Sequence, residues 1–281
     1  MLADYHVHSA YSDDSTYPME QVVRDAIRIN LDELCFTEHV DYGVKPDWDH
    51  PAGARFEDGH PVTNCPYPAY FDELELVRER YAKDIRVTRG FELGVQSHTI
   101  LHYERLLQVY GDRLDFTLLS IHQVGDQEFW SGEFQDGRTQ EEFTMAYYEE
   151  LLAVVERFHG YSVLAHLDLI RRYDPTPGGP LPFSFYRDIV AEILRHVIDD
   201  GHGIEVNTSG WRYGLEGPQP TNDVLRLYRD LGGTVITLGS DSHKPEHLGA
   251  YLRLAQSRLL SLGFSHACTY ASGEPRFYEL G

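Results

Sequence analysis

The sequence predicts an α/β protein in which parallel strands close into a barrel wrapped by helices. Seven or eight short β-rich runs alternate with amphipathic helical runs along the 281 residues, which is typical of repeated β-then-α units. No G-x-G-x-x-G or Walker loop follows any of these runs, which weakens the nucleotide-binding form of the alternative fold, an open doubly wound sheet. Because no long polar linker divides the chain, we expect one domain over residues 1–281.

Each predicted element rests on a local signal. The expected strands are Leu2–Val7, Glu33–Thr37, Ile85–Glu92, Phe116–Ile121, Ser162–Ala165, Gly203–Val206, Thr234–Leu238 and, as an eighth candidate, Ala267–Tyr270. The helix signals are Pro18 at a first helical position, a Thr139–Glu142 capping box, an apolar stripe from Phe185 to Val197 that stops near Gly201, Thr221 as the cap of a helix ending at Gly232-Gly233, and Pro245 opening the last long helix.

Composition and charge exclude several classes of function. The chain has 45 acidic and 24 basic residues, a formal net charge of −21, which argues against binding to nucleic acid or to an anionic membrane. It has no apolar stretch of transmembrane length, and the N-terminal MLADYHVHS is unlike a secretory signal. Three scattered cysteines cannot form a disulfide framework, so we expect a reducing, cytoplasmic location.

Potential metal ligands end nearly every predicted strand. The carboxyl ends of strands in a parallel barrel converge on one rim, so these side chains should meet. They are His6, His8, His39, Glu92, His122, His166, Asp241 and His243, with Asp14 in a loop that can fold back over the others. Imidazoles and carboxylates in this number suit a cluster of divalent metal ions.

The His6-Val7-His8 segment is the sharpest local signal. Residues i and i+2 of a strand point to the same face, so both imidazoles aim at one point, and Asp241-Ser242-His243 repeats that spacing. An isolated pair of this kind is more often two unrelated histidines, but the two pairs together favour metal ligation. Gly239 allows the backbone to approach a metal cluster closely.

Glu92 and three arginines complete the candidate site. The Glu92 carboxylate can bridge two cations, which a neutral imidazole cannot do. Arg171, Arg172 and Arg212 lie in predicted rim loops and carry the side chain best suited to holding phosphate. The alternative for each arginine is an ordinary surface ion pair.

The strings DYHVHS, CFTEHVD, GFELG, SIHQ, AHLDLIRRY, EVNTSGWRYG and ITLGSDSHKPEHLG resemble the polymerase-and-histidinol-phosphatase (PHP) superfamily and, within it, the monofunctional histidinol-phosphate phosphatases. The resemblance implies a distorted (β/α)7 barrel holding three divalent metal ions, Mn, Fe or Zn. It implies a first ion on His6, His8, Glu92 and Asp241, a second on Glu92, His122 and His166, and a third on Asp14, His39 and His243. Some members have His in place of Asp14, and the extra carboxylate here would favour Mn or Fe over Zn.

The implied reaction is hydrolysis of L-histidinol phosphate, a small phosphomonoester, to L-histidinol and phosphate in histidine biosynthesis. Arg172 and Arg212, with Arg171 as a further candidate, would clamp the phosphate. Asp241 or His243 would protonate the leaving alkoxide.

Three alternatives remain open at this point. One is a phosphoesterase of the same superfamily that acts on another small phosphomonoester or a nucleotide. Another is a non-catalytic metal-binding accessory domain, which should have lost ligands. A third is a mononuclear barrel amidohydrolase, which needs a bridging Lys, and no predicted strand here ends in Lys. The oligomeric state is also open, a homo-oligomer being one outcome.

Overall fold

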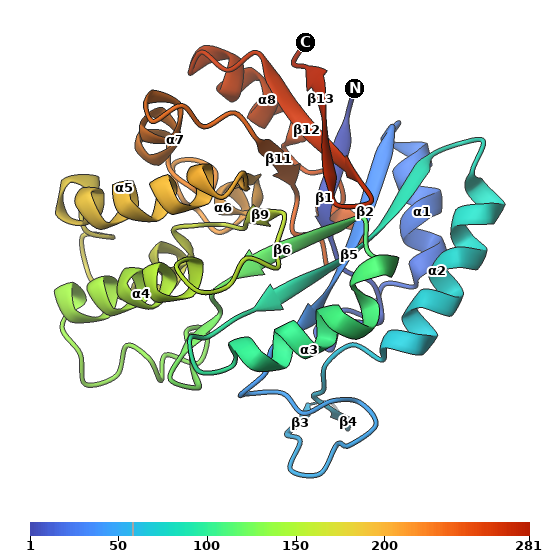
Figure 1. Cartoon of the computed structure of the whole chain (residues 1–281), viewed down its shortest axis with the longest axis horizontal. Helices are drawn as coiled ribbons and strands as arrows, with labels where there is room; N and C mark the ends of the chain where they lie inside the picture. The colour runs from blue at the N-terminus through green and yellow to red at the C-terminus, as the bar shows by residue number, and fades with distance from the viewer. Residues whose placement is uncertain (58) are drawn as a thin grey trace.

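The computed structural model describes residues 1–57 and 59–281, and their main sheet confirms the predicted barrel (Figure 1). Seven parallel strands follow the order β1-β2-β5-β6-β9-β10-β11 among the described residues. They are β1 (Ala3–Val7), β2 (Glu33–Val40), β5 (Arg86–Gly94), β6 (Phe116–Ser120), β9 (Val163–Leu164), β10 (Gly203–Asn207) and β11 (Ile236–Gly239). Two short hairpins lie in the loops: β3 (Phe56–Glu57) with β4 (His60–Pro61), and β7 (Gln123–Val124) with β8 (Gln127–Glu128).

The barrel closes through residues that follow β11. Val7 and Ser242 form an isolated parallel bridge. The backbone N–H of His8 donates to the Ser242 carbonyl at 2.8 Å, and the N–H of Ser242 donates to the His6 carbonyl at 3.2 Å. The first and last strands of the barrel are therefore joined at their carboxyl ends, by the same segments that carry both predicted pairs of ligands.

Helices cover the outside of the sheet, with α4 and α5 side by side on the left of Figure 1 and α1 and α2 on the right. They are α1 (Met19–Arg28), α2 (Tyr67–Tyr81), α3 (Ile100–Tyr110), α4 (Gln140–Val155), α5 (Phe183–Asp199), α6 (Ser209–Arg212), α7 (Asn222–Asp230) and α8 (Leu252–Ser261), with 3₁₀ turns at Gly111–Arg113, Leu169–Tyr173 and Pro245–His247. The capping box of α4 is confirmed, because Thr139 Oγ1 accepts from the Glu142 N–H while the Glu142 carboxylate accepts from the Thr139 N–H.

The eighth predicted strand does not belong to the barrel. Ala267–Tyr270 lies within β12 (His266–Ala271), which pairs antiparallel with β13 (Glu274–Glu279) in a separate hairpin. The Tyr270 ring packs on Tyr5 and Phe116 in the barrel interior, at the end opposite the predicted ligands. The hairpin thus seals this end of the barrel with aromatic side chains, and this burial accounts for the apolar sequence that made it look like a barrel strand.

One predicted helix start needs correction, and one predicted cap lacks its side-chain hydrogen bond. Pro245 begins only the one-turn Pro245–His247 segment, and the last helix starts at Leu252. Gly249 and Tyr251 lie between this turn and the helix, with φ of 67° and 61°. Residues in this left-handed conformation cannot continue a helix. Thr221 does stand at the N-cap of α7, but its side chain makes no capping hydrogen bond.

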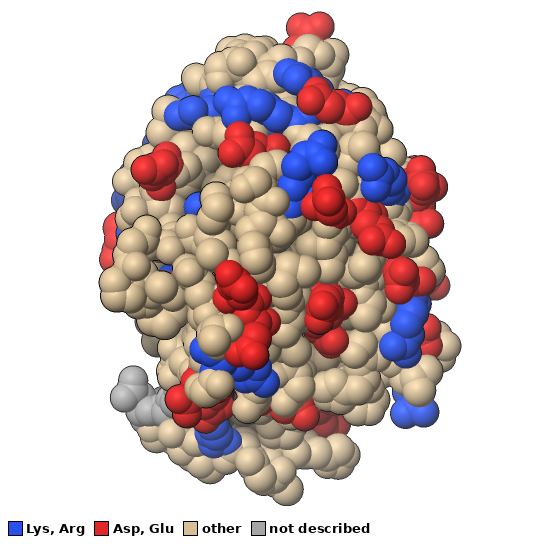
Figure 2. Space-filling model, turned by 90° about the vertical axis from the view of Figure 1, so that its left-hand side faces the viewer, with Lys and Arg blue, Asp and Glu red and all other residues tan. Residues whose placement is uncertain are grey.

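The charged surface is mixed. On the face that Figure 2 shows, acidic and basic side chains lie interspersed in small groups.

Within the described part of the chain, no helix is both long and apolar enough to cross a membrane.

All three cysteines should be unreactive in the folded protein. Cys35, Cys65 and Cys268 are buried, and burial raises the pKa of each thiol, that of Cys268 to about 11. At neutral pH the thiols are therefore mostly protonated, and their sulfur atoms are not accessible to solvent, so little reactive thiolate is available. We expect dithiobis-nitrobenzoate to label none of the thiols in the native protein and all three after denaturation. Rapid labelling of the native protein would contradict this expectation.

Candidate metal centre

The predicted ligands converge on the carboxyl-end rim of the barrel, at the floor of a cavity of about 430 Å³. Seven of them line the cavity, namely Asp14, His39, Glu92, His122, His166, Asp241 and His243. His6 and His8 lie beneath these, fully buried. The structure therefore brings together all nine residues, eight from strand ends far apart in the sequence and Asp14 from the loop after β1.

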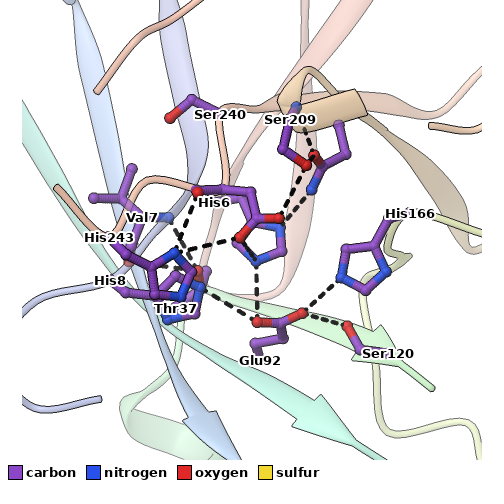
Figure 3. A network of polar contacts seen from close by, with 12 residues as sticks. His6, Val7, His8, Thr37, Glu92, Ser120, His166, Ser209, Ser240 and His243 are labelled. Atoms are coloured by element: carbon purple, nitrogen blue, oxygen red, sulfur yellow. Dashed lines mark hydrogen bonds and ion pairs between the residues drawn. The ribbon is translucent and has the colours of Figure 1, made fainter. Parts of the chain in front are cut away.

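Glu92 stands at the centre of the group and faces five imidazoles of the described residues. Figure 3 shows three of them, those of His6, His8 and His166. Its Oε2 lies 3.0 Å from His6 Nε2, 3.3 Å from His8 Nε2 and 3.1 Å from His39 Nδ1, and its Oε1 lies 3.0 Å from His122 Nε2 and 2.9 Å from His166 Nε2. Burial alone would raise the pKa of the Glu92 carboxyl, but the facing imidazoles hold it well below its usual range. Glu92 is therefore ionised at neutral pH.

Four potential ligand atoms around Glu92 have no hydrogen-bond partner among the described residues. Within the described residues, His6 Nε2, His8 Nε2, His39 Nδ1 and Glu92 Oε2 are buried without one. Buried polar atoms are nearly always satisfied, so four orphaned atoms converging on one point require another partner. Divalent cations fit, because imidazole nitrogen and carboxylate oxygen are the ligands that Zn, Mn and Fe accept.

Asp14 and Asp241 extend the cluster on either side. Asp14 Oδ2 lies 3.1 Å from His243 Nε2 and 3.5 Å from His39 Nε2, so the loop after β1 does fold back over the rim. Asp241 Oδ1 lies 3.8 Å from His6 Nε2 and 3.6 Å from His243 Nδ1. Each of the three predicted ligand groups is thus gathered in one place.

The backbone is strained at two of these positions. Asp241 has φ of 55° and His166 has φ of 22°, in the region that residues other than glycine rarely adopt. Such conformations persist where the surrounding structure fixes them, commonly at functional sites. Gly239 is needed for a related reason, since a Cβ there would lie 2.1 Å from Glu205 Oε1 and 2.4 Å from the His6 Cβ.

Two carboxylates that orient the imidazoles were missed in the sequence. Glu205 Oε1 lies 2.7 Å from His6 Nδ1, and Asp41 Oδ1 lies 2.8 Å from His122 Nδ1. The Lys45 Nζ lies 2.9 Å from Asp41 Oδ2, and the lysine side chain is only 10% exposed. A signal was present for both, because Glu205 interrupts an otherwise apolar strand and Asp41 directly follows the Glu38-His39-Val40 strand end. When an imidazole binds a metal through one ring nitrogen, a carboxylate hydrogen-bonded to the other ring nitrogen fixes its tautomer and orientation.

Removing the charge of either orienting carboxylate should weaken metal binding while leaving the ligands in place. We expect Asp41→Asn and Glu205→Gln each to lower metal affinity by about 10- to 100-fold. Equilibrium dialysis against a graded chelator buffer measures this change. Asp25→Asn, a buried carboxylate on α1 that accepts from the Tyr17 hydroxyl, is the matched control and should bind metal as the wild type does. Unchanged affinity in both test variants would contradict an orienting role.

The three predicted arginines have different surroundings. The Arg172 guanidinium lines the cavity, contacts Ser209, and lies 3.2 Å from Asp241 Oδ2. Arg212 also lines the cavity, and its terminal nitrogens donate to the Ser240 and Asp241 carbonyls.

Arg171 differs from both in where its side chain points. Its Nη1 donates to the Tyr186 hydroxyl at 2.9 Å, and its Nε lies 3.8 Å from Asp168 Oδ2. It is not among the cavity-lining residues of the described chain. The structure therefore brings Arg172 and Arg212, but not Arg171, to the cavity.

Comparison with known proteins agrees with this site. The PHP domain family model matches residues 4–209. The chain is 30% identical to the histidinol-phosphatase of Lactococcus lactis over 95% of this chain and 94% of that protein, and 24% identical to the histidinol-phosphatase of Saccharomyces cerevisiae over 88% and 85%. The crystal structure of the Lactococcus lactis histidinol phosphate phosphatase, complexed with zinc, L-histidinol and phosphate, superposes with a TM-score of 0.85 at 29% identity and covers 98% of both chains. The chain belongs to the PHP domain family.

Proposed function

We propose that this protein hydrolyses L-histidinol phosphate to L-histidinol and phosphate. The observation that carries the proposal is a cavity floored by seven metal-type ligands, with Arg172 and Arg212 among the residues that line it. The histidinol-phosphatases of Lactococcus lactis and Saccharomyces cerevisiae, aligned along most of their length, support the same substrate. The buried, reduced thiols are compatible with the cytoplasmic location that we propose.

We propose three divalent ions, Mn, Fe or Zn, on this cluster. His6, His8, Glu92 and Asp241 would hold the first, Glu92, His122 and His166 the second, and Asp14, His39 and His243 the third. Bound divalent ions supply Lewis acidity toward phosphate oxygens and lower the pKa of bound water, which yields a nucleophile at neutral pH.

The chain's own groups hold the phosphate and the leaving oxygen. Arg172 and Arg212 approach the cavity from the loops after β9 and β10, and their N–H groups would face the non-bridging phosphate oxygens. Negative charge grows on these oxygens as the phosphoryl group transfers, so these hydrogen bonds should strengthen in the transition state. Asp241 and His243 line the same cavity, and either would place a proton near the leaving oxygen.

Acidic and aromatic side chains also line the cavity, among them Glu128, Asp13, Trp130 and Tyr213. Glu128 pairs with Arg55 and Asp13 pairs with Lys45, so cations of the same wall balance both carboxylates. The aromatic faces attract cations, since the Arg55 guanidinium lies over Trp130 and that of Arg172 over Tyr213, and a cationic imidazole would use faces of the same kind.

Phosphate release from a panel of phosphomonoesters tests the proposal. With Mn²⁺ present, we expect histidinol phosphate to give the highest kcat/KM, well above those for sugar phosphates and nucleotides. A higher kcat/KM for another ester would establish the alternative phosphoesterase. No turnover of any ester by fully metal-loaded protein would favour the accessory-domain alternative.

Removal of metal should abolish this activity. After exhaustive chelation, verified by metal analysis, we expect no phosphate release above background. Restoring Mn²⁺, Fe²⁺ or Zn²⁺ should recover it, because bound divalent ions lower the pKa of water and supply a nucleophile at neutral pH. Full activity in demonstrably metal-free protein would overturn the metal-dependent mechanism.

A further inference from the structure

A second group of metal-type ligands lies at the opposite end of the barrel. His159 lies in the loop before β9, and Asp200 and His202 lie between α5 and β10. Because β10 begins directly after His202 and runs toward the cavity, its five residues separate this group from the rim by about 16 Å. An ion bound here would not reach a substrate in the cavity.

The three side chains already approach the spacing of a metal site. His159 Nδ1 lies 3.0 Å from Asp200 Oδ2, and one ligand atom from each of the three residues lies within 4.8 Å of the others. Atoms that share a tetrahedral ion at about 2.1 Å lie roughly 3.4 Å apart, so small side-chain rotations would complete the site.

The surrounding structure holds two of the ligands in place. The His202 ring packs against Tyr161 with ring centroids 4.1 Å apart, and the backbone N–H of His202 donates to the Val197 carbonyl in the last turn of α5. The Asp200 N–H donates to the His196 carbonyl of the same turn. His202 is only partly exposed, so its ring stays close to Asp200 and His159.

The electrostatic setting also favours a cation. Asp200 is the C-cap of the 17-residue helix α5, whose carbonyl end carries the negative pole of the helix dipole. Asp200 adds a formal negative charge at the same point. Two imidazoles and one carboxylate form the donor set that Zn²⁺, Ni²⁺ and Cu²⁺ accept, whereas Mg²⁺ prefers oxygen ligands.

We propose that His159, Asp200 and His202 form a second metal site for Zn²⁺ or a similar transition metal, separate from the catalytic cluster. Water would complete the coordination, because the His159 side chain is 56% exposed. The bound ion would connect the loop after α4 to the end of α5, two helices that pack side by side (Figure 1). It would therefore act as a structural clamp and would stabilise the folded chain.

Zn²⁺ titration of the enzyme with its catalytic metals in place tests this proposal. Calorimetry and metal analysis should show one more Zn²⁺ per chain in the wild type than in His159→Ala/His202→Ala. Zn²⁺ should raise the Tm of the wild type but not of the double variant, and Mg²⁺ should raise neither. Phosphate release by the double variant should stay within about twofold of wild type, which shows that the catalytic ions remain.

Two further variants complete the design. Asp200→Asn keeps the shape of the side chain but loses its charge, and we expect Zn²⁺ affinity to fall at least about tenfold. His98→Ala removes an imidazole from another exposed pair, 3.1 Å from Asp126, and should bind as much Zn²⁺ as the wild type. Equal Zn²⁺ stoichiometry in the wild type and the double variant would overturn the proposal, as would an equal loss in His98→Ala.

Discussion

Glu92→Gln should reduce phosphate release by at least about 1,000-fold and lower the metal content from about three ions per chain. The Glu92 carboxylate faces the imidazoles of His6, His8, His39, His122 and His166. Gln keeps the shape but loses the charge, and its amide N–H₂ would point at nitrogen lone pairs that are directed at cations. A neutral side chain in this place can neither bridge two ions nor balance their charge.

Glu33→Gln is the matched control. Glu33 is likewise a buried strand glutamate, but it lies at the start of β2, where its carboxylate accepts from the Tyr5 hydroxyl at the sealed end of the barrel. We expect it to keep its metal and its turnover. Metal analysis, steady-state kinetics and circular dichroism on both variants separate loss of the site from loss of the fold. Wild-type turnover in Glu92→Gln would show that Glu92 is an ordinary strand-end residue.

Arg212→Ala should lose about 30- to 1,000-fold in kcat/KM, corresponding to about 2–4 kcal/mol of transition-state stabilisation. The guanidinium lines the cavity, and burial lowers its pKa without neutralising it. Since charge on the phosphate oxygens increases during transfer, the loss should appear in kcat as well as in KM. Arg212→Lys should recover only part of it, because an ammonium cannot reproduce the bidentate fork.

The same arginine also donates to the Ser240 and Asp241 carbonyls, so metal content must be measured beside the kinetics. A full metal complement in Arg212→Ala assigns the loss to phosphate binding. Arg171→Lys is the control, since Arg171 faces Tyr186 and Asp168, and it should remain within about threefold of wild type. If Arg212→Ala also remains within threefold, the phosphate clamp would have to be assigned to Arg172 alone.

Strand-end positions were the most predictable part of the site. A parallel barrel brings the carboxyl ends of its strands to one rim, so His6, Glu92 and Asp241 could be grouped without coordinates. Asp14 was a candidate from its position in the loop after His8, but only the family resemblance assigned it to a ligand group, because the path of a loop is not set by strand periodicity. Arg171 and Arg172 are neighbours in the chain, and only the course of the Leu169–Tyr173 turn decides which of them faces the cavity.

Each departure from the sequence analysis has its own physical cause. A strand that seals a barrel end and a strand within the barrel both bury one apolar face, so Ala267–Tyr270 could not be told from a barrel strand by pattern. Pro245 is compatible with a helix start, but the positive φ values of Gly249 and Tyr251 delay the helix. Glu205 and Asp41 act through imidazole nitrogens that lie across the barrel or a loop, and sequence spacing does not encode these contacts.

Barrel closure through Ser242 has a consequence for synthesis on the ribosome. Asp4 and Ser240, which hydrogen-bond to each other, are 236 positions apart, so one side of the seam is made long before the other. A nascent chain that ends at β10 lacks Asp241, His243 and the bridge from Val7 to Ser242. It exposes strand edges whose N–H and C=O groups are unpaired, and such edges promote aggregation and binding by chaperones. Closure of the barrel and completion of the ligand cluster therefore both require synthesis to have passed His243, and we expect chains terminated before β11 to release no phosphate.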